Sequence, residues 1–118
     1  MLAAINKRDR NHRKAKKELI MIFEKSNEIP MVSDYILDEC YTYVAYNIPE
    51  KLDKFEKFVE MFLIVPVGIE TFRRAKEVFK KFFPKLSFTD STTIVLAKGL
   101  NARLLSYDEE MTRVFYSY

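Results

Sequence analysis

Three acidic residues stand where their carboxylates could share one ligand. Glu39 lies early in an expected helix that follows a short strand, Asp90 lies at an expected helix start, and Asp108 lies just past the last expected strand. Parallel α/β sheets bind ligands beyond the carboxyl ends of their strands, so these side chains could converge. Converging carboxylates would give Mg²⁺ or Mn²⁺ hard oxygen ligands, and such an ion can activate water and stabilise a phosphorane-like transition state.

Each acid also has a structural interpretation. Asp and Glu are common at surfaces and at helix ends, and the position of Asp90 favours capping over catalysis when that residue is considered alone. Glu39 flanks the apolar stripe of its helix, whereas Asp38 points further toward solvent. The spacing by itself leaves both interpretations open.

The elements that must position these acids alternate between helix and strand. Residues 11–24 predict an amphipathic helix, with Asp9 or Asn11 as its N-cap. A short strand at residues 31–32 leads to Ser33 and Asp34, either of which can cap a helix through residues 36–44.

Further helix and strand signals follow to residue 83. Pro49 and Glu50 suit a new helix start, and the apolar residues from 52 to 62 repeat every three or four positions. The continuous apolar run at residues 63–67 predicts a buried strand. A helix over residues 69–83 should end before Pro84. Its expected inner face is Ile69, Phe72, Ala75, Phe79 and Phe82.

The distal part predicts one more helix and one more strand. Thr89 or Asp90 can cap a helix through residues 94–96, and Gly99 is its expected left-handed terminator. Residues 102–106 predict the last strand. The alternation as a whole predicts a single domain over residues 1–118, a three-layer α/β fold with a short, mostly parallel sheet flanked by helices.

Composition limits the class of protein. The 118 residues are 48% apolar, with ten Phe and seven Tyr, so a core can form without disulfides or metals. The single cysteine, Cys40, excludes a disulfide framework and fits a reducing interior. A reducing interior predicts a cytoplasmic location. No apolar stretch reaches the roughly 20 residues needed to span a bilayer, so we expect a soluble protein. Abundant Lys and Glu hint at a hot environment.

The local sequences around the acids resemble the PIN domain family, including its toxin ribonucleases, over nearly the whole chain. SDYILDECYTYVA resembles the second acidic motif of the family, with Glu39 at the metal-site position. SFTDSTTIVLAKGLNARLLSYDEEM resembles the distal half, in which Asp90 and Asp108 match the third and fourth acids and Ser106 the hydroxyl two residues before the last. RDRNHRKAK resembles the stretch after the first family helix.

The resemblance departs at the start of the chain. Family members begin with an apolar strand that ends in Asp, and residues 1–4 match the helix that follows it. On this comparison the chain is an N-terminally truncated PIN-like domain, which lacks one metal ligand and a central strand of the sheet. We therefore expect weak or absent activity in this form, and an upstream continuation of the gene in which Met1 is internal. Residues 1–5, a partner chain or a repacked core could compensate for the strand.

The resemblance implies a metal-dependent endoribonuclease, the toxin of a toxin–antitoxin pair, that uses Mg²⁺ or Mn²⁺. It further implies a homodimer and a small antitoxin whose Arg or Lys side chains pair with the acids. The alternative is a catalytically inactive binding or dimerisation module, because an open sheet edge is a template for pairing.

A basic segment and two other features have more than one interpretation. Positions 7 to 17 contain seven basic residues and one acidic residue, and the basic side chains could bind RNA phosphates or form a solvated helix face. The nucleic-acid-binding candidates are Arg8, Arg10, Arg13, Lys14 and Lys17. The only histidine, His12, suits local hydrogen bonding near a helix start. The aromatic C-terminus could pack onto the core or form a dimer contact.

Overall fold

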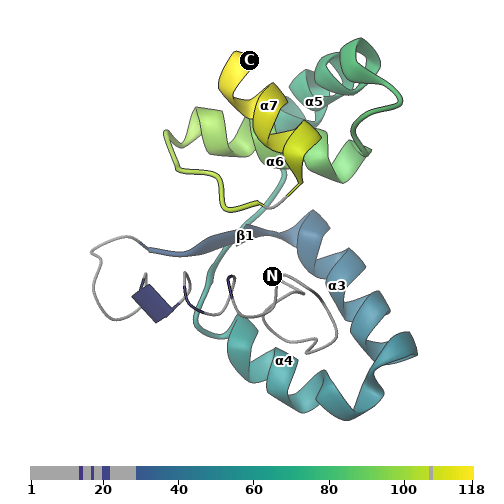
Figure 1. Cartoon of the computed structure of the whole chain (residues 1–118), viewed down its shortest axis with the longest axis vertical. Helices are drawn as coiled ribbons and strands as arrows, with labels where there is room; N and C mark the ends of the chain where they lie inside the picture. Colours follow the sequence, from purple (N-terminus) through teal and green to yellow (C-terminus); the bar gives the residue numbers. More distant parts are fainter. Residues whose placement is uncertain (1–13, 15–16, 18–19, 22–28, 107) are drawn as a thin grey trace. The chain divides into compact units, whose positions relative to one another are not determined.

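The computed structural model describes residues 14, 17, 20–21, 29–106 and 108–118 (Figure 1). It divides into two compact units, residues 1–65 and residues 66–118, and each is described by itself. In the first unit, Lys14 and Lys17 are helical and exposed, as expected for the polar face of the helix at residues 11–24. Its capping candidates and its inner face lie outside the described residues.

The first unit contains a parallel pair of strands joined by helices. Strand β1 (Met31–Ser33) pairs with strand β2 (Leu63–Val65), and Val32 lies opposite Ile64. Helix α3 (Asp34–Asn47), the 3₁₀ turn η1 (Pro49–Lys51) and helix α4 (Leu52–Val59) connect them. Parallel strands need such a helical crossover, which confirms the expected α/β class and its short parallel sheet.

Local signals explain where α3 and α4 begin. The Ser33 hydroxyl accepts a hydrogen bond from the Ile36 amide at 3.1 Å, so Ser33, one of the two predicted candidates, is the N-cap of α3. Pro49 occupies the first turn of η1, as expected. The apolar faces of the two helices meet in one core with β1. The buried members of this core are Val32, Leu37, Cys40, Val44, Phe55 and Val59.

The second unit packs three helices around its own core. Helix α5 (Ile69–Phe82) packs against helix α6 (Phe88–Gly99), and helix α7 (Glu109–Ser117) packs against α6. The buried members of this core are Ala75, Val78, Leu86, Ile94, Val95, Met111, Val114 and Phe115. The C-terminal aromatics divide between core and solvent, since Phe115 is buried whereas Tyr116 and Tyr118 are exposed.

Some expectations about strands and faces are wrong. Residues 102–106 form no strand, because among the described residues β1 and β2 pair only with each other. The strand predicted over residues 63–67 exists, but Leu63 and Ile64 are about half exposed, at 53% and 50%. A strand is buried on both sides only where other elements cover both faces of its sheet. Ile69, predicted on the inner face of α5, is 67% exposed.

The ends of α6 also differ from the prediction. Its N-cap is Ser87 rather than Thr89 or Asp90, so the helix begins two or three residues earlier than those capping residues predicted. Gly99 is part of the helix and does not have a positive φ. Asn101, with φ 51°, takes the left-handed conformation instead, which is the role that Asn fills most readily after Gly.

Candidate functional site

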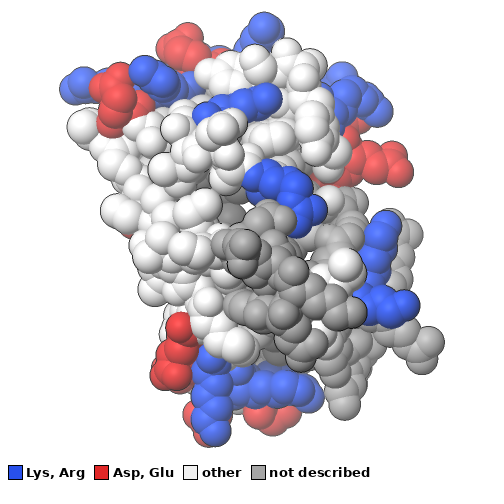
Figure 2. All heavy atoms as spheres, turned by 90° about the vertical axis from the view of Figure 1, so that its left-hand side faces the viewer, with Lys and Arg blue, Asp and Glu red and all other residues white. Residues whose placement is uncertain are grey.

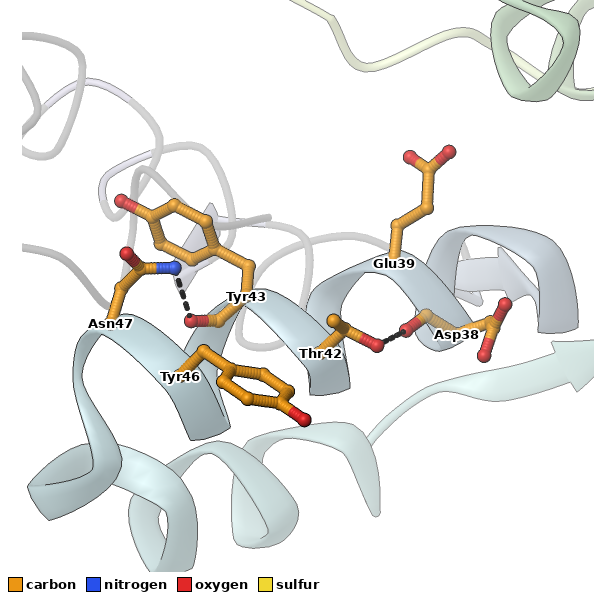
Figure 3. A pocket seen from close by; sticks show the side chains of 6 residues that line it. All are labelled: Asp38, Glu39, Thr42, Tyr43, Tyr46 and Asn47. Atoms are coloured by element: carbon orange, nitrogen blue, oxygen red, sulfur yellow. Dashed lines mark hydrogen bonds between the residues drawn. The ribbon is translucent and has the colours of Figure 1, made fainter.

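Glu39 lies on the exposed side of α3. The buried residues Leu37, Cys40 and Val44 fix the inward face of this helix, which leaves both Asp38 and Glu39 exposed. Figure 3 shows the two carboxylates leaving the helix in different directions.

An open pocket of about 410 Å³ lies along this exposed side of α3. Its lining residues are Asp38, Glu39, Thr42, Tyr43, Tyr46 and Asn47 (Figure 3). The Thr42 hydroxyl donates to the Asp38 carbonyl at 3.1 Å, and the Asn47 amide donates to the Tyr43 carbonyl at 3.0 Å. All six residues belong to one helix. The pocket therefore contains one of the three predicted acids, and one helix alone lines it.

Asp90 forms part of a capping box at the start of α6. Its Oδ2 accepts a hydrogen bond from the Ser87 amide at 3.1 Å, and the Ser87 hydroxyl accepts one from the Asp90 amide at 3.0 Å. Asp90 thus contributes to capping, as the structural interpretation predicts, but from the third helical position and not as the N-cap. Among the described residues, none donates a hydrogen bond to the second carboxylate oxygen, and no Lys or Arg forms an ion pair with it.

Asp108 caps α7 in a similar way. Its Oδ1 accepts a hydrogen bond from the Met111 amide at 3.1 Å. The Ser106 hydroxyl accepts a hydrogen bond from the Asp108 amide at 3.1 Å and lies 3.6 Å from the Met111 sulfur. Ser106 therefore fixes the backbone from which the Asp108 side chain leaves. No described residue donates a hydrogen bond to the second oxygen of Asp108.

The three acids divide between the two units. Glu39 belongs to residues 1–65, whereas Asp90 and Asp108, with Ser106, belong to residues 66–118. Within either unit, the described residues bring no three His, Cys, Asp or Glu side chains close enough to hold a metal ion. The convergence of all three acids stays a prediction.

Comparison with known proteins decides the family. The PIN domain profile matches residues 1–115, nearly the whole chain. The chain belongs to the PIN domain family. It is also similar to a VapC ribonuclease of Archaeoglobus fulgidus, with 39% identity over 87 residues that cover 69% of this chain and 54% of that protein. The chain thus spans about half the length of this curated relative. No solved structure matches.

The residues of this PIN domain fit the divalent ion that the family resemblance implies. All three candidate ligands are carboxylates, the donors that Mg²⁺ and Mn²⁺ prefer. The side chains of Asp90 and Asp108 are each oriented by one amide hydrogen bond, which leaves one oxygen of each for a cation. The thiol of Cys40 is buried, and burial, together with the neighbouring Glu39 carboxylate, raises its pKa.

The predicted nucleic-acid-binding residues are described only in part. Lys14 and Lys17 are exposed, whereas Arg8, Arg10 and Arg13 lie outside the described residues, as does His12. On the face drawn in Figure 2, Lys and Arg side chains lie at several separate places, some of them beside Asp and Glu. No helix among the described residues is both long enough and apolar enough to cross a membrane.

The sequence reasoning missed Ser87, the residue that completes the capping box with Asp90. A signal for it is present, because a Ser followed three residues later by an acidic residue, shortly before an apolar run, is typical of a helix N-terminus. It also missed the helix that Asp108 begins, although Asp108 is followed by two acids that suit a first turn.

Proposed function

We propose that this chain is a Mg²⁺- or Mn²⁺-dependent endoribonuclease that acts as the toxin of a toxin–antitoxin pair. The observation that carries the proposal is the state of two carboxylates in a PIN domain. Asp90 and Asp108 each commit one oxygen to a helix N-terminus and keep the other without a donor among the described residues. A carboxylate held in this way is oriented before any ion binds, which is what a metal ligand requires.

The residues have distinct roles in this proposal. Glu39, Asp90 and Asp108 hold the ion, which when bound supplies Lewis acidity and lowers the pKa of a coordinated water. Ser106 positions Asp108 through the hydrogen bond it accepts from the Asp108 amide. The capping bonds of Asp90 and Asp108 restrict the rotation of both side chains, so that little ordering remains when the ion binds.

The partners follow from the same proposal. The similar protein from A. fulgidus is named a VapC ribonuclease, which supports RNA as the substrate. A small antitoxin would present Arg or Lys to the three carboxylates, and two copies of the chain would form a homodimer. Residues 1–118 would then act as one PIN-like domain.

The test of the proposal is RNA cleavage with Mg²⁺ or Mn²⁺ added, compared between the unsubstituted chain and Asp90→Asn. Asp53→Asn is the matched control, because Asp53 also lies in the first turn of a helix, α4, and loses the same charge. We expect weak metal-dependent cleavage, since one ligand of the family is missing, and we expect Asp90→Asn to lose it while Asp53→Asn keeps it. Equal cleavage by all three proteins would exclude Asp90 as a ligand.

A second candidate function is a PIN-like binding or dimerisation module without activity. The half-exposed apolar side chains of Leu63 and Ile64 on β2 favour it, because exposed apolar residues on a strand suit association. Sedimentation of the chain, alone and with a candidate partner peptide, tests this alternative. A monomer that binds no peptide yet cleaves RNA would remove it.

A further inference from the structure

The charged side chains of α5 separate into two stripes. One stripe alternates in sign along the helix, with a spacing of three or four residues that places its members on one face. Its members are Glu70, Arg74, Glu77 and Lys81. The Arg74 guanidinium lies 3.8 Å from the Glu70 carboxylate, so this stripe compensates its own charge.

The second stripe of α5 is entirely basic. Arg73, Lys76 and Lys80 recur at the same helical spacing, and all three side chains are exposed. No described carboxylate lies within salt-bridge distance of any of them. The Lys76 ammonium lies 5.9 Å from the centroid of the Phe72 ring, a contact that does not neutralise its charge. Three positive charges therefore lie within about 10 Å along the helix, and none of them forms an ion pair with a described carboxylate.

An exposed aromatic ring continues the basic stripe at the end of α5. Phe83 follows Lys80 by three residues, and its φ of −56° is still helical, so its side chain leaves in the direction of the same stripe. The Phe83 residue is 66% exposed. Its ring meets the Phe79 ring at a centroid distance of 5.6 Å and an angle of 68°. This contact limits how the ring can turn while leaving most of it open to solvent.

We propose that Arg73, Lys76, Lys80 and Phe83 form a binding surface for single-stranded RNA. The three cations match the phosphates of the RNA backbone, and an exposed ring offers a stacking platform for an unpaired base. An RNA duplex would not use the ring, since its bases are already stacked on one another. The inference rests on the proposed function in one respect, because this surface would hold nucleotides of the RNA that the acids cleave.

The experiment is fluorescence anisotropy with a labelled single-stranded RNA of about 12 nucleotides, in EDTA, so that no cleavage occurs. The stripe variant Arg73→Gln/Lys80→Gln is compared with the control Arg74→Gln/Lys81→Gln. The two variants lose the same charges from the same helix at the same spacing. In the stripe variant, the slope of log K against log salt should become less negative by about 1.4, or 0.7 for each lost phosphate contact. In the control it should not change.

The aromatic part of the surface is tested separately with Phe83→Ala. Loss of one stacked base should weaken binding by about 5- to 150-fold with no change in the salt slope, while Phe83→Tyr keeps most of the affinity. Thermal unfolding of each variant checks that the helices of the unit remain folded. A duplex of the same length should be insensitive to Phe83→Ala.

Specific outcomes overturn the inference. Equal losses in the two charge variants would show that net charge, and not this stripe, attracts RNA. Unchanged binding in the stripe variant would assign the stripe to another partner, such as an acidic protein surface. The proposed function can fail separately from this inference. RNA binding that depends on the stripe, without metal-dependent cleavage, would contradict the nuclease function and support the binding surface. Metal-dependent cleavage with identical RNA binding by the two charge variants would support the nuclease function and contradict the binding surface.

Discussion

Two substitutions at the start of α6 can separate the capping role of Asp90 from its proposed role as a metal ligand. Ser87→Ala removes the hydroxyl that accepts from the Asp90 amide at 3.0 Å, but it leaves the backbone amide that donates to the Asp90 carboxylate. Asp90→Asn keeps an oxygen that can accept from that amide and removes the negative charge. The first change therefore affects the helix, and the second affects mainly a bound cation.

The magnitudes of the two substitutions follow from these contacts. Loss of a Ser N-cap costs about 1 kcal/mol, within a range of 0.5 to 2. Loss of the Asp90 charge near the positive end of the helix costs about 0.3 to 1 kcal/mol. For a chain of this length, 1 kcal/mol corresponds to roughly 3 to 6 °C in Tm. Without metal, Ser87→Ala should therefore be at least as destabilising as Asp90→Asn.

The assay is thermal unfolding with and without Mn²⁺. An ion at 100 times its Kd stabilises the folded state by about 2.7 kcal/mol, and binding weakened 100-fold leaves only about 0.4 kcal/mol at the same concentration. Ser87→Ala should keep the full Mn²⁺ increment in Tm, and Asp90→Asn should lose most of it. A full increment in Asp90→Asn, or a lost increment in Ser87→Ala, would refute the reasoning. No increment in the unsubstituted chain would remove Mn²⁺ binding from the proposal.

Three further predictions concern stability. Ile94→Ala in the core of the second unit should cost about 2 to 5 kcal/mol in urea unfolding, whereas Ile69→Ala at an exposed position should stay within about 0.5 kcal/mol. Because burial raises the pKa of the Cys40 thiol above its ordinary value of 9.0, the associated stability is complete below that pH and is lost as the pH rises through the folded value. The urea midpoint should therefore fall at alkaline pH by more in the unsubstituted chain than in Cys40→Ala. Asn101→Gly should be neutral or slightly stabilising by the same measurement, because φ is 51° there and Gly adopts this conformation readily. Asn101→Val should cost about 1 to 3 kcal/mol for the same reason. Equal urea midpoints for these two variants would contradict a left-handed residue at this position.

Helices were predictable from this sequence because their signals are local. The apolar repeat of α4 and the capping residue of α3 act within one or two turns, and both predictions are confirmed. The prediction that Gly99 takes the left-handed conformation at the helix end is wrong. Both Gly and Asn adopt this conformation readily, and here Asn101, two residues after Gly99, adopts it, while Gly99 is the last residue of the helix.

Strands were less predictable because a strand depends on its partners. Residues 63–65 form a strand because they pair with β1, with Val65 opposite Ser33. Residues 102–106 have a shorter apolar run, Leu104 and Leu105, pair with no described strand and are irregular. The run at residues 63–67 also predicted burial, which depends on the layers that cover a sheet rather than on the run itself.

The candidate site illustrates why residue types alone left two interpretations open. An acid at a helix N-terminus is stabilised by the free amides there, and the same amides orient its carboxylate. Capping and metal binding therefore favour the same residue at the same position, and Asp90 and Asp108 satisfy the structural requirement with one oxygen each. Capping accounts for one oxygen only. Whether a charge is needed on the other is a chemical question, which is why a change of charge at constant shape, Asp90→Asn, separates the two interpretations where a change to Ala would remove both.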